Sequence, residues 1–149
     1  MSPGELFDKY GWMGITITKE NFGDWYKERY RPWIRVRLSV FEDALMIKVF
    51  VVEMDKLTDP EKIEQIKIRE SKDGFWWLNF QAGRAMRIIE AIHPQMEEQK
   101  KVADLVLGMK GRKTFYETGK KLPVEEAVAR KAIIEEIKRL NGERFKVDN

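Results

Sequence analysis

The fold is decided by the stretch from Phe75 to Met109, FWWLNFQAGRAMRIIEAIHPQMEEQKKVADLVLGM. It opens with Phe75–Gln81, an apolar and aromatic segment that predicts a strand. From Ala82 to Ile92 apolar residues recur at the spacing of one helix face. His93-Pro94 then interrupts the pattern, because proline cannot continue a helical hydrogen-bond ladder but suits a first helical turn. The stretch therefore predicts a strand followed by two helices, Ala82–Ile92 and Gln95–Met109.

The composition describes one highly charged globular domain of 149 residues, with 43% hydrophobic and 36% charged residues. The absence of cysteine excludes disulfides and thiolate metal sites, and the single histidine, His93, argues against a histidine-based zinc site or a catalytic triad. No apolar run approaches the roughly 18 residues that span a membrane, and the first residues lack a signal pattern. We expect an intracellular protein without membrane contact, and the dense charge without cysteine hints at a thermophile.

A four-stranded antiparallel sheet is the predicted centre of the domain. Alternating apolar residues or β-branched runs predict its strands at Gly14–Lys19, Trp33–Val40, Ile63–Glu70 and Phe75–Gln81. Lys72-Asp73-Gly74 predicts the turn between the last two strands, because Asp-Gly supports the positive φ of hairpin turns. The polar, aromatic segment Glu20–Arg31 is interpreted as a loop. Trp76 and Trp77 are neighbours on one strand, so one indole faces the core and the other faces the open side of the sheet.

Further helices are predicted at both ends of the chain and between the strands. Glu5–Tyr10 is a short helix that Gly11 ends, and Glu42–Met54 is long enough to favour a helix over a strand. Pro123–Asn141 has acidic residues in its first turn and basic residues in its last, as a helix dipole favours. Asn141-Gly142 is its predicted stop. The domain is thus expected to span residues 1–142, followed by a disordered tail at 143–149.

The strand Trp33–Val40 separates two kinds of side chain. Ile34, Val36, Leu38 and Val40 point one way, whereas Trp33, Arg35 and Arg37 point the other. Five basic residues lie between Lys27 and Arg37 against Glu28 alone. A solvated charged surface is the plainer explanation, but a single sign of charge beside a tryptophan favours contact with nucleic-acid phosphates. The predicted DNA-binding residues are Lys19, Lys27, Arg29, Arg31, Trp33, Arg35, Arg37, Gln65, Lys67, Arg69, Lys72 and Lys100.

The order of these elements resembles the LAGLIDADG homing endonuclease family in its single-motif form. The residues that carry the resemblance are Leu6–Ile17 (LFDKYGWMGITI), Ile89, Ile92, Pro94, Lys100, Ala103–Leu107, Pro123, Glu125, Glu126, Arg130 and Ile137–Asn141. The resemblance implies an α+β fold of αββαββα order, with helices on one face of the sheet, extra C-terminal helices and DNA on the other face. It also implies paired signature helices, here a homodimer through Glu5–Tyr10, and acids at the helix ends that hold Mg²⁺ for cleavage.

This sequence departs from the family at its catalytic positions. Tyr10 stands where the family has the metal-binding acid directly before the final glycine, and Gln99 stands where it often has a basic residue. A neutral tyrosine is no carboxylate ligand for Mg²⁺. Asp8 is the remaining acid, but two residues earlier on a helix turns it by about 200°. We therefore expect an inactive DNA-binding protein that needs no cofactor. The alternatives are an Mg²⁺-dependent endonuclease that uses Asp8, and a protein–protein interaction module.

Overall fold

The computed structural model describes residues 1–22, 25–58, 60–61, 66–110 and 124–148, without the side chains at 19–29 and 145–148. Its elements are α1 (Pro3–Tyr10), β1 (Gly11–Phe22), β2 (Trp25–Leu38), α2 (Phe41–Thr58), β3 (Arg69–Glu70), β4 (Trp76–Gln81), α3 (Ala82–Ile92), the 3₁₀ turn η2 (His93–Gln95), α4 (Lys100–Gly108) and α5 (Val124–Asp148). Within this part of the chain, no helix is long and apolar enough to cross a membrane.

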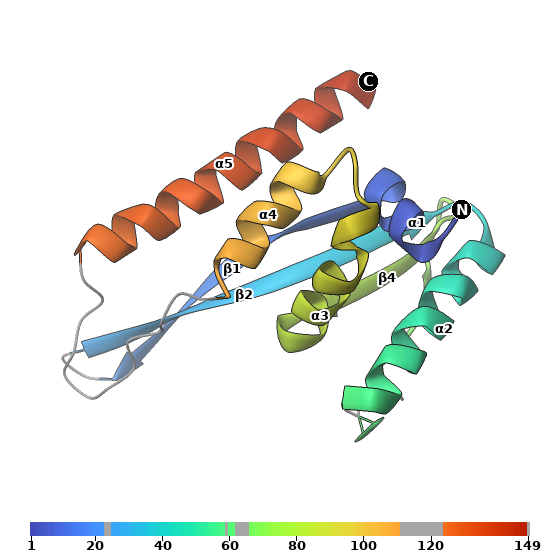
Figure 1. Ribbon diagram of the computed structural model, residues 1–149, viewed down its shortest axis with the longest axis horizontal. Coiled ribbons are helices and arrows are strands. Elements are labelled where there is room, and N and C mark those ends of the chain that lie inside the picture. The colour runs from blue at the N-terminus through green and yellow to red at the C-terminus, as the bar shows by residue number, and fades with distance from the viewer. Residues whose placement is uncertain (23–24, 59, 62–65, 111–123, 149) are drawn as a thin grey trace.

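The sheet is four-stranded and antiparallel, in the order β1-β2-β4-β3, and the α-helices of the described residues lie on one side of it (Figure 1). The register places Met13 opposite Ile34, and Ile34 opposite Phe80, so that buried side chains form one continuous row across three strands. The α+β class, the αββαββα order and the extra C-terminal helices are therefore confirmed.

The core lies between this row and the helices. Leu6 and Phe7 bring α1 into it, and the Phe7 ring meets Phe80 edge-on at 6.2 Å between centroids. The inward face of α3 adds Ala85, Ile88, Ile89 and Ile92, all of them buried. Complete burial of each large aliphatic side chain stabilises the fold by about 1.5–3 kcal/mol. As a result α1, despite its short length, is fixed against the sheet.

The hairpin of β1 and β2 is longer than predicted. The proposed loop Glu20–Arg31 was wrong, because β1 runs to Phe22 and β2 starts at Trp25. In Figure 1 these ends of the two strands project beyond α3 and α4. Of the helices, α5 reaches the start of this extension, where Arg130 lies 4.6 Å from the Tyr30 ring. The regular alternation of apolar and polar residues that identified the other strands is missing from it. At its other end β2 stops at Leu38, and Val40 is exposed instead of facing the core.

Two elements before and after β4 also differ from the prediction. Of the proposed strand Ile63–Glu70, only Arg69–Glu70 pairs in the sheet, while residues 62–65 lie outside the described part. The helix predicted from Gln95 begins at Lys100, because Pro94 starts only a 3₁₀ turn and the following backbone N–H groups bond to a side chain of α1. The turn before β4 is confirmed, with Gly74 at a φ of 84°.

Helix α5 continues past the predicted stop at Asn141-Gly142 to Asp148, through residues for which a disordered tail was expected. Two contacts hold this extension. Asn141 donates from Nδ2 to the Met13 carbonyl at 3.1 Å. The Arg144 guanidinium donates to the carbonyls of Asp8, at 3.0 Å, Lys9 and Gly11. The C-terminal end of α1 is thus capped by a side chain from the other end of the chain.

Replacing Arg144 with alanine is expected to lower the free energy of unfolding by about 1–3 kcal/mol, because it removes the partner of half-buried carbonyls at the end of α1. Urea unfolding followed by far-UV circular dichroism measures the loss. Lys138→Ala is the matched control, since Lys138 is an exposed cation of the same helix whose ion pair is local, and it should change the value by less than about 0.5 kcal/mol. Equal effects of the two substitutions would contradict this role of Arg144.

Candidate nucleic-acid interface

The side of the sheet away from the helices, here called the open face, carries the residues that alternate with the buried row. Strand register places the following residues on it: Trp12, Gly14, Thr16, Thr18, Arg31, Trp33, Arg35, Arg37, Arg69, Trp77, Asn79 and Gln81. Every charged member of this set is an arginine. One acid approaches from the rim, where Asp73 in the turn before β4 lies 3.8 Å from Arg37.

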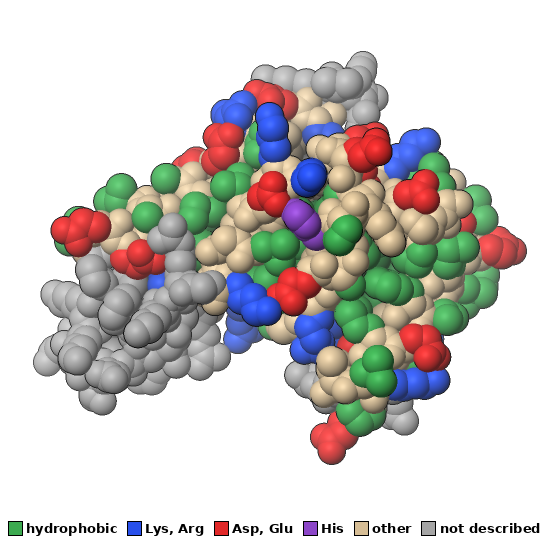
Figure 2. Space-filling view, in the orientation of Figure 1, with side chains coloured by type: hydrophobic (Ala, Val, Ile, Leu, Met, Phe, Trp, Pro, Cys, Tyr) green, Lys and Arg blue, Asp and Glu red, His purple; other side chains and the backbone are tan. Residues whose placement is uncertain are grey.

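The helical side of the molecule has a different charge distribution. Figure 2 shows this side, where Lys and Arg are intermixed with Asp and Glu. Several of these charges pair, as in Lys56–Glu53 and Arg139–Glu136. A surface that only keeps the protein soluble has such a mixture. The single sign of charge on the described part of the open face is therefore a local feature of the sheet.

The structure brings five of the predicted DNA-binding residues together on the open face: Arg31, Trp33, Arg35, Arg37 and Arg69. Lys67 and Lys72 are exposed near β3, one before the strand and one in the turn that follows it. Lys19, Lys27 and Arg29 lie on the long hairpin, but their side chains and residue Gln65 lie outside the described part. Lys100 starts α4 on the helical side, so it does not join the open face.

The open face also carries aromatic rings that the sequence did not place. Trp77 lies outward and stacks on Trp12, with ring centroids 6.3 Å apart and planes 19° apart. Its neighbour Trp76 lies on the other side, 4.7 Å from Phe41 of α2. The Arg35 guanidinium lies 5.2 Å from the Trp33 ring and 6.0 Å from Trp77. The open face thus combines guanidinium groups with indoles.

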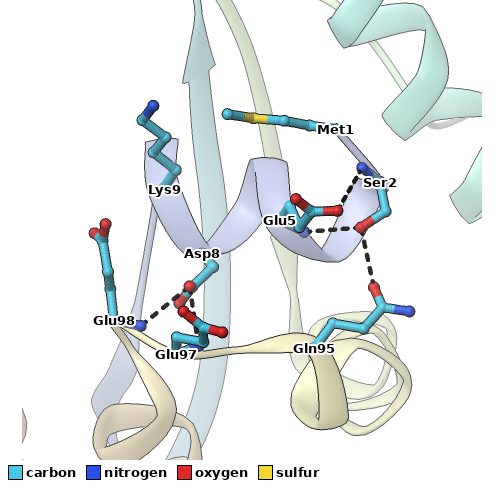
Figure 3. A pocket seen from close by; sticks show the side chains of 8 residues that line it. All are labelled: Met1, Ser2, Glu5, Asp8, Lys9, Gln95, Glu97 and Glu98. Carbon is cyan, nitrogen blue, oxygen red and sulfur yellow. Dashed lines mark hydrogen bonds between the residues drawn. The ribbon is translucent and has the colours of Figure 1, made fainter.

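At the end of α1, where the resemblance places the metal-binding acid, the Asp8 side chain forms hydrogen bonds that hold the fold together. Asp8 is 7% exposed, and its carboxylate accepts the backbone N–H groups of Glu97 (3.0 Å), Glu98 (3.1 Å) and Gln99 (2.8 Å) (Figure 3 shows the first two). Charge-assisted bonds of this kind are about twice as strong as neutral ones. Asp8 therefore joins α1 to the segment that leads into α4.

Gln99 completes this arrangement from the opposite direction. Its side chain is 1% exposed, and Nε2 lies within hydrogen-bond distance of the carbonyls of Phe7 (3.0 Å), Asp8 (2.9 Å) and Gly11 (2.8 Å). Together with Arg144 it satisfies carbonyl groups that a helix end leaves without intrahelical partners. The sequence signalled neither contact, because Asp8 and Gln99 are separated by 91 positions along the chain.

The residues at this position do not fit a divalent metal. Mg²⁺ requires several hard oxygen ligands in octahedral geometry. Tyr10 is an exposed phenol, and both Asp8 oxygens are bonded to the backbone. Within the described residues, no group of three or more His, Cys, Asp or Glu side chains could hold a metal ion. No step of a metal-dependent reaction can be assigned to these groups.

A surface pocket of about 530 Å³ beside α1 is lined by polar groups that serve the helix (Figure 3). Ser2 and Glu5 form a reciprocal capping box, with the Glu5 N–H donating to Ser2 Oγ and the Ser2 N–H donating to Glu5 Oε1, both at 3.2 Å. Ser2 Oγ also donates to Gln95 Oε1 at 3.3 Å. These groups are paired with one another, and the pocket is explained by the capping of α1.

Comparison with known proteins gives a match in structure alone. No family model matches the sequence, and no curated protein matches it. The homing endonuclease I-CvuI, in complex with its target in the presence of calcium, superposes with a TM-score of 0.54 at 16% identity, over 92% of this chain and 78% of that chain. The chain has the LAGLIDADG homing endonuclease fold.

Two further homing endonucleases agree with this result. I-TnaI superposes with a TM-score of 0.53 at 15% identity, covering 96% of this chain and 97% of the other. The archaeal intron-encoded I-Vdi141I, complexed with DNA, gives a TM-score of 0.50 at 10% identity over 92% and 80%. The homing endonuclease fold extends through nearly the whole chain, and the resemblance drawn from the sequence is confirmed at this level.

Proposed function

We propose that this protein binds duplex DNA through the open face of its sheet and does not cleave it. The observation that carries the proposal is the row of arginines Arg31, Arg35, Arg37 and Arg69 on the side of the sheet away from the helices, where no described side chain of a strand is acidic. Guanidinium groups suit phosphate oxygens, since they are always charged and donate in a fixed fork. Arg31 and Arg35 extend along β2, and Arg69 adds a charge from β3 at the far edge.

Uncharged polar side chains on the same face could distinguish base pairs. Asn79 and Gln81 are exposed on β4, and Thr16 and Thr18 are exposed on β1. Asn and Gln can form paired hydrogen bonds with adenine in the major groove, and hydroxyl groups can bond to several bases. The β1–β2 hairpin has the form of a two-stranded ribbon, which the major groove can admit. The proposal thus assigns phosphate contact to the arginines and base contact to these neutral residues.

The loss of cleavage follows from the chemistry at the end of α1. A carboxylate that already accepts three N–H bonds is costly to redirect toward a metal, and Tyr10 offers no second carboxylate. The fold neighbours support DNA as the partner, because the I-CvuI and I-Vdi141I structures contain DNA. The magnesium complex of I-CvuI is described as holding uncleaved DNA.

The homodimer remains part of the proposal. The family's arrangement pairs two α1 helices, and the side chains that α1 exposes here are Glu5, Lys9 and Tyr10. Two copies would double the length of the DNA site and the number of phosphate contacts.

One experiment separates binding from cleavage. Wild-type protein is incubated with labelled random duplex DNA and with supercoiled plasmid, each in EDTA and in Mg²⁺ or Mn²⁺. We expect binding of the duplex at low salt in EDTA and an intact plasmid under every condition. Metal-dependent cutting that Asp8→Asn abolishes, with fold retained, would overturn the assignment and favour the endonuclease. Failure to bind DNA at any salt concentration would favour the protein–protein module.

A further inference from the structure

The part of the open face nearest α1 differs chemically from the rest. Three indoles from three strands gather there, Trp12 on β1, Trp33 on β2 and Trp77 on β4, each of them half-buried. Farther along the hairpin the described open-face residues are Thr16, Thr18 and Arg31. Contact with the edges of stacked base pairs needs hydrogen-bonding side chains, which these indoles largely lack. Their grouping at one end of the open face therefore indicates a ligand group other than the edges of stacked base pairs.

The Trp33 ring lies close against β1 because residue 14 is glycine. A Cβ at Gly14 would lie 2.7 Å from Cζ2, 2.9 Å from Cε2 and 3.1 Å from Nε1 of Trp33. Three ring atoms at such similar distances show that the indole spans the backbone of the neighbouring strand. The indole therefore lies against the Gly14 backbone, and the Arg35 guanidinium lies over the ring.

A hollow adjoins this ring. A pocket of about 330 Å³ is lined by Thr16, Trp33, Arg35, Asn79 and Gln81 on the open face, and by the core residues Ile34 and Phe80. Arg35 is exposed, with its guanidinium 5.2 Å from the Trp33 ring, and so can reach a phosphate beside a ligand placed on the indole. Asn79 and Gln81 supply amide groups at the same position. An aromatic floor with amide and guanidinium groups at its border suits one planar base.

We propose that the indole cluster Trp12, Trp33 and Trp77, with Arg35, binds unpaired bases by stacking, so that the preferred ligand is DNA with a single-stranded or unpaired segment. Stacking requires a free base face, which a continuous duplex offers only at its ends. Arg35 either stacks on an aromatic ring or forms an ion pair with the adjoining phosphate. This inference rests on the proposed function, and it specifies the form of the DNA at one end of the open face.

The test measures binding to three fluorescent DNAs. Two have equal length and charge: a matched duplex, and the same duplex with a central unpaired bubble. The third is a single strand with the same total number of nucleotides. Salt and pH are fixed, and metal is absent. We expect the bubble to bind at least about tenfold more tightly than the matched duplex, since each stacked base contributes about 5- to 100-fold. Bases on the indoles should also quench tryptophan fluorescence. An oligoribonucleotide of the same sequence distinguishes DNA from RNA as the source of the unpaired base.

Two variants test the site itself. Trp33→Leu removes the proposed floor, and Gly14→Ala keeps every ring but forces the Trp33 indole to shift. Both should reduce the ratio of bubble affinity to matched-duplex affinity by about fivefold or more. Trp76→Leu is the control, because it removes an indole of the same sheet on the covered side. Circular dichroism and thermal unfolding establish whether each variant is folded. If Trp33→Leu does not fold, Gly14→Ala provides the test.

The outcomes separate this inference from the proposed function. Equal binding of bubble and matched duplex, or a preference for the duplex, would overturn the stacking inference and leave duplex binding by the arginines intact. Loss of the preference in Trp76→Leu as strongly as in Trp33→Leu would also overturn it. Absence of binding to every DNA would remove the proposed function, and the inference with it.

Discussion

Replacing Asp8 with alanine should lower the free energy of unfolding by about 3–4 kcal/mol, the largest loss expected from one polar substitution here. The substitution leaves the N–H groups of Glu97, Glu98 and Gln99 without their acceptor. The Gln99 N–H is buried and so bears the full cost, whereas the other two are partly accessible to water. Chemical denaturation followed by far-UV circular dichroism gives the free energies.

Asp104→Ala is the matched control. Asp104 is an exposed aspartate of α4 that interacts with His93, so its loss should cost less than about 1 kcal/mol. Asp8→Asn should fall between the two, because one amide oxygen replaces two charged acceptors. If Asp8→Ala is as stable as wild type, Asp8 does not hold the segment before α4 through hydrogen bonds. Its carboxylate would then be available to bind a metal.

The second large effect concerns DNA. Changing Arg31, Arg35 and Arg69 together to glutamine is expected to weaken duplex binding about 100-fold or more near 0.1 M salt. It should also reduce the slope of log K against log[salt] by about 2–3, because each lost phosphate contact removes about 0.9. Fluorescence anisotropy over a range of salt concentrations measures both quantities.

The control removes the same charge from the helical side. Lys101, Lys131 and Lys138 are exposed on α4 and α5, and changing all three to glutamine gives an equal change in net charge. This variant should bind DNA within about threefold of wild type, since charges far from the contact are screened beyond a Debye length of about 10 Å. If both triple variants lose affinity equally, net charge and not the open face governs binding.

Much of the fold was predictable because local patterns and tertiary packing agree. Helix α3 has the predicted bounds, since its apolar spacing matches the face that packs on the sheet. The alternation in β2 gave the correct inward and outward residues from Trp33 to Leu38. The alternation of apolar and polar residues does not predict strands that project beyond the core, as the ends of β1 and β2 do. The length of α5 was missed because Arg144 and Asn141 bond to residues more than 120 positions away.

The candidate site was predictable to the extent that it follows strand alternation. Trp33, Arg35, Arg37 and Arg69 were placed on one face by their period of two, whereas Arg31, assigned to a loop, joins them because β2 is longer than predicted. Which of two adjacent tryptophans faces outward depends on register, and a shift of one residue exchanges them. Trp12 was missed because its role depends on Trp77, from a distant strand.

The central claim is that the open face is a DNA-binding surface, and the salt dependence of wild-type binding tests it most directly. Binding to random duplex DNA is measured in EDTA between low and moderate salt. The account predicts a linear fall of log K with log[salt], with a slope of about −3 to −5 for the described arginines and their neighbours. A slope near zero, or no binding at low salt, would contradict the claim.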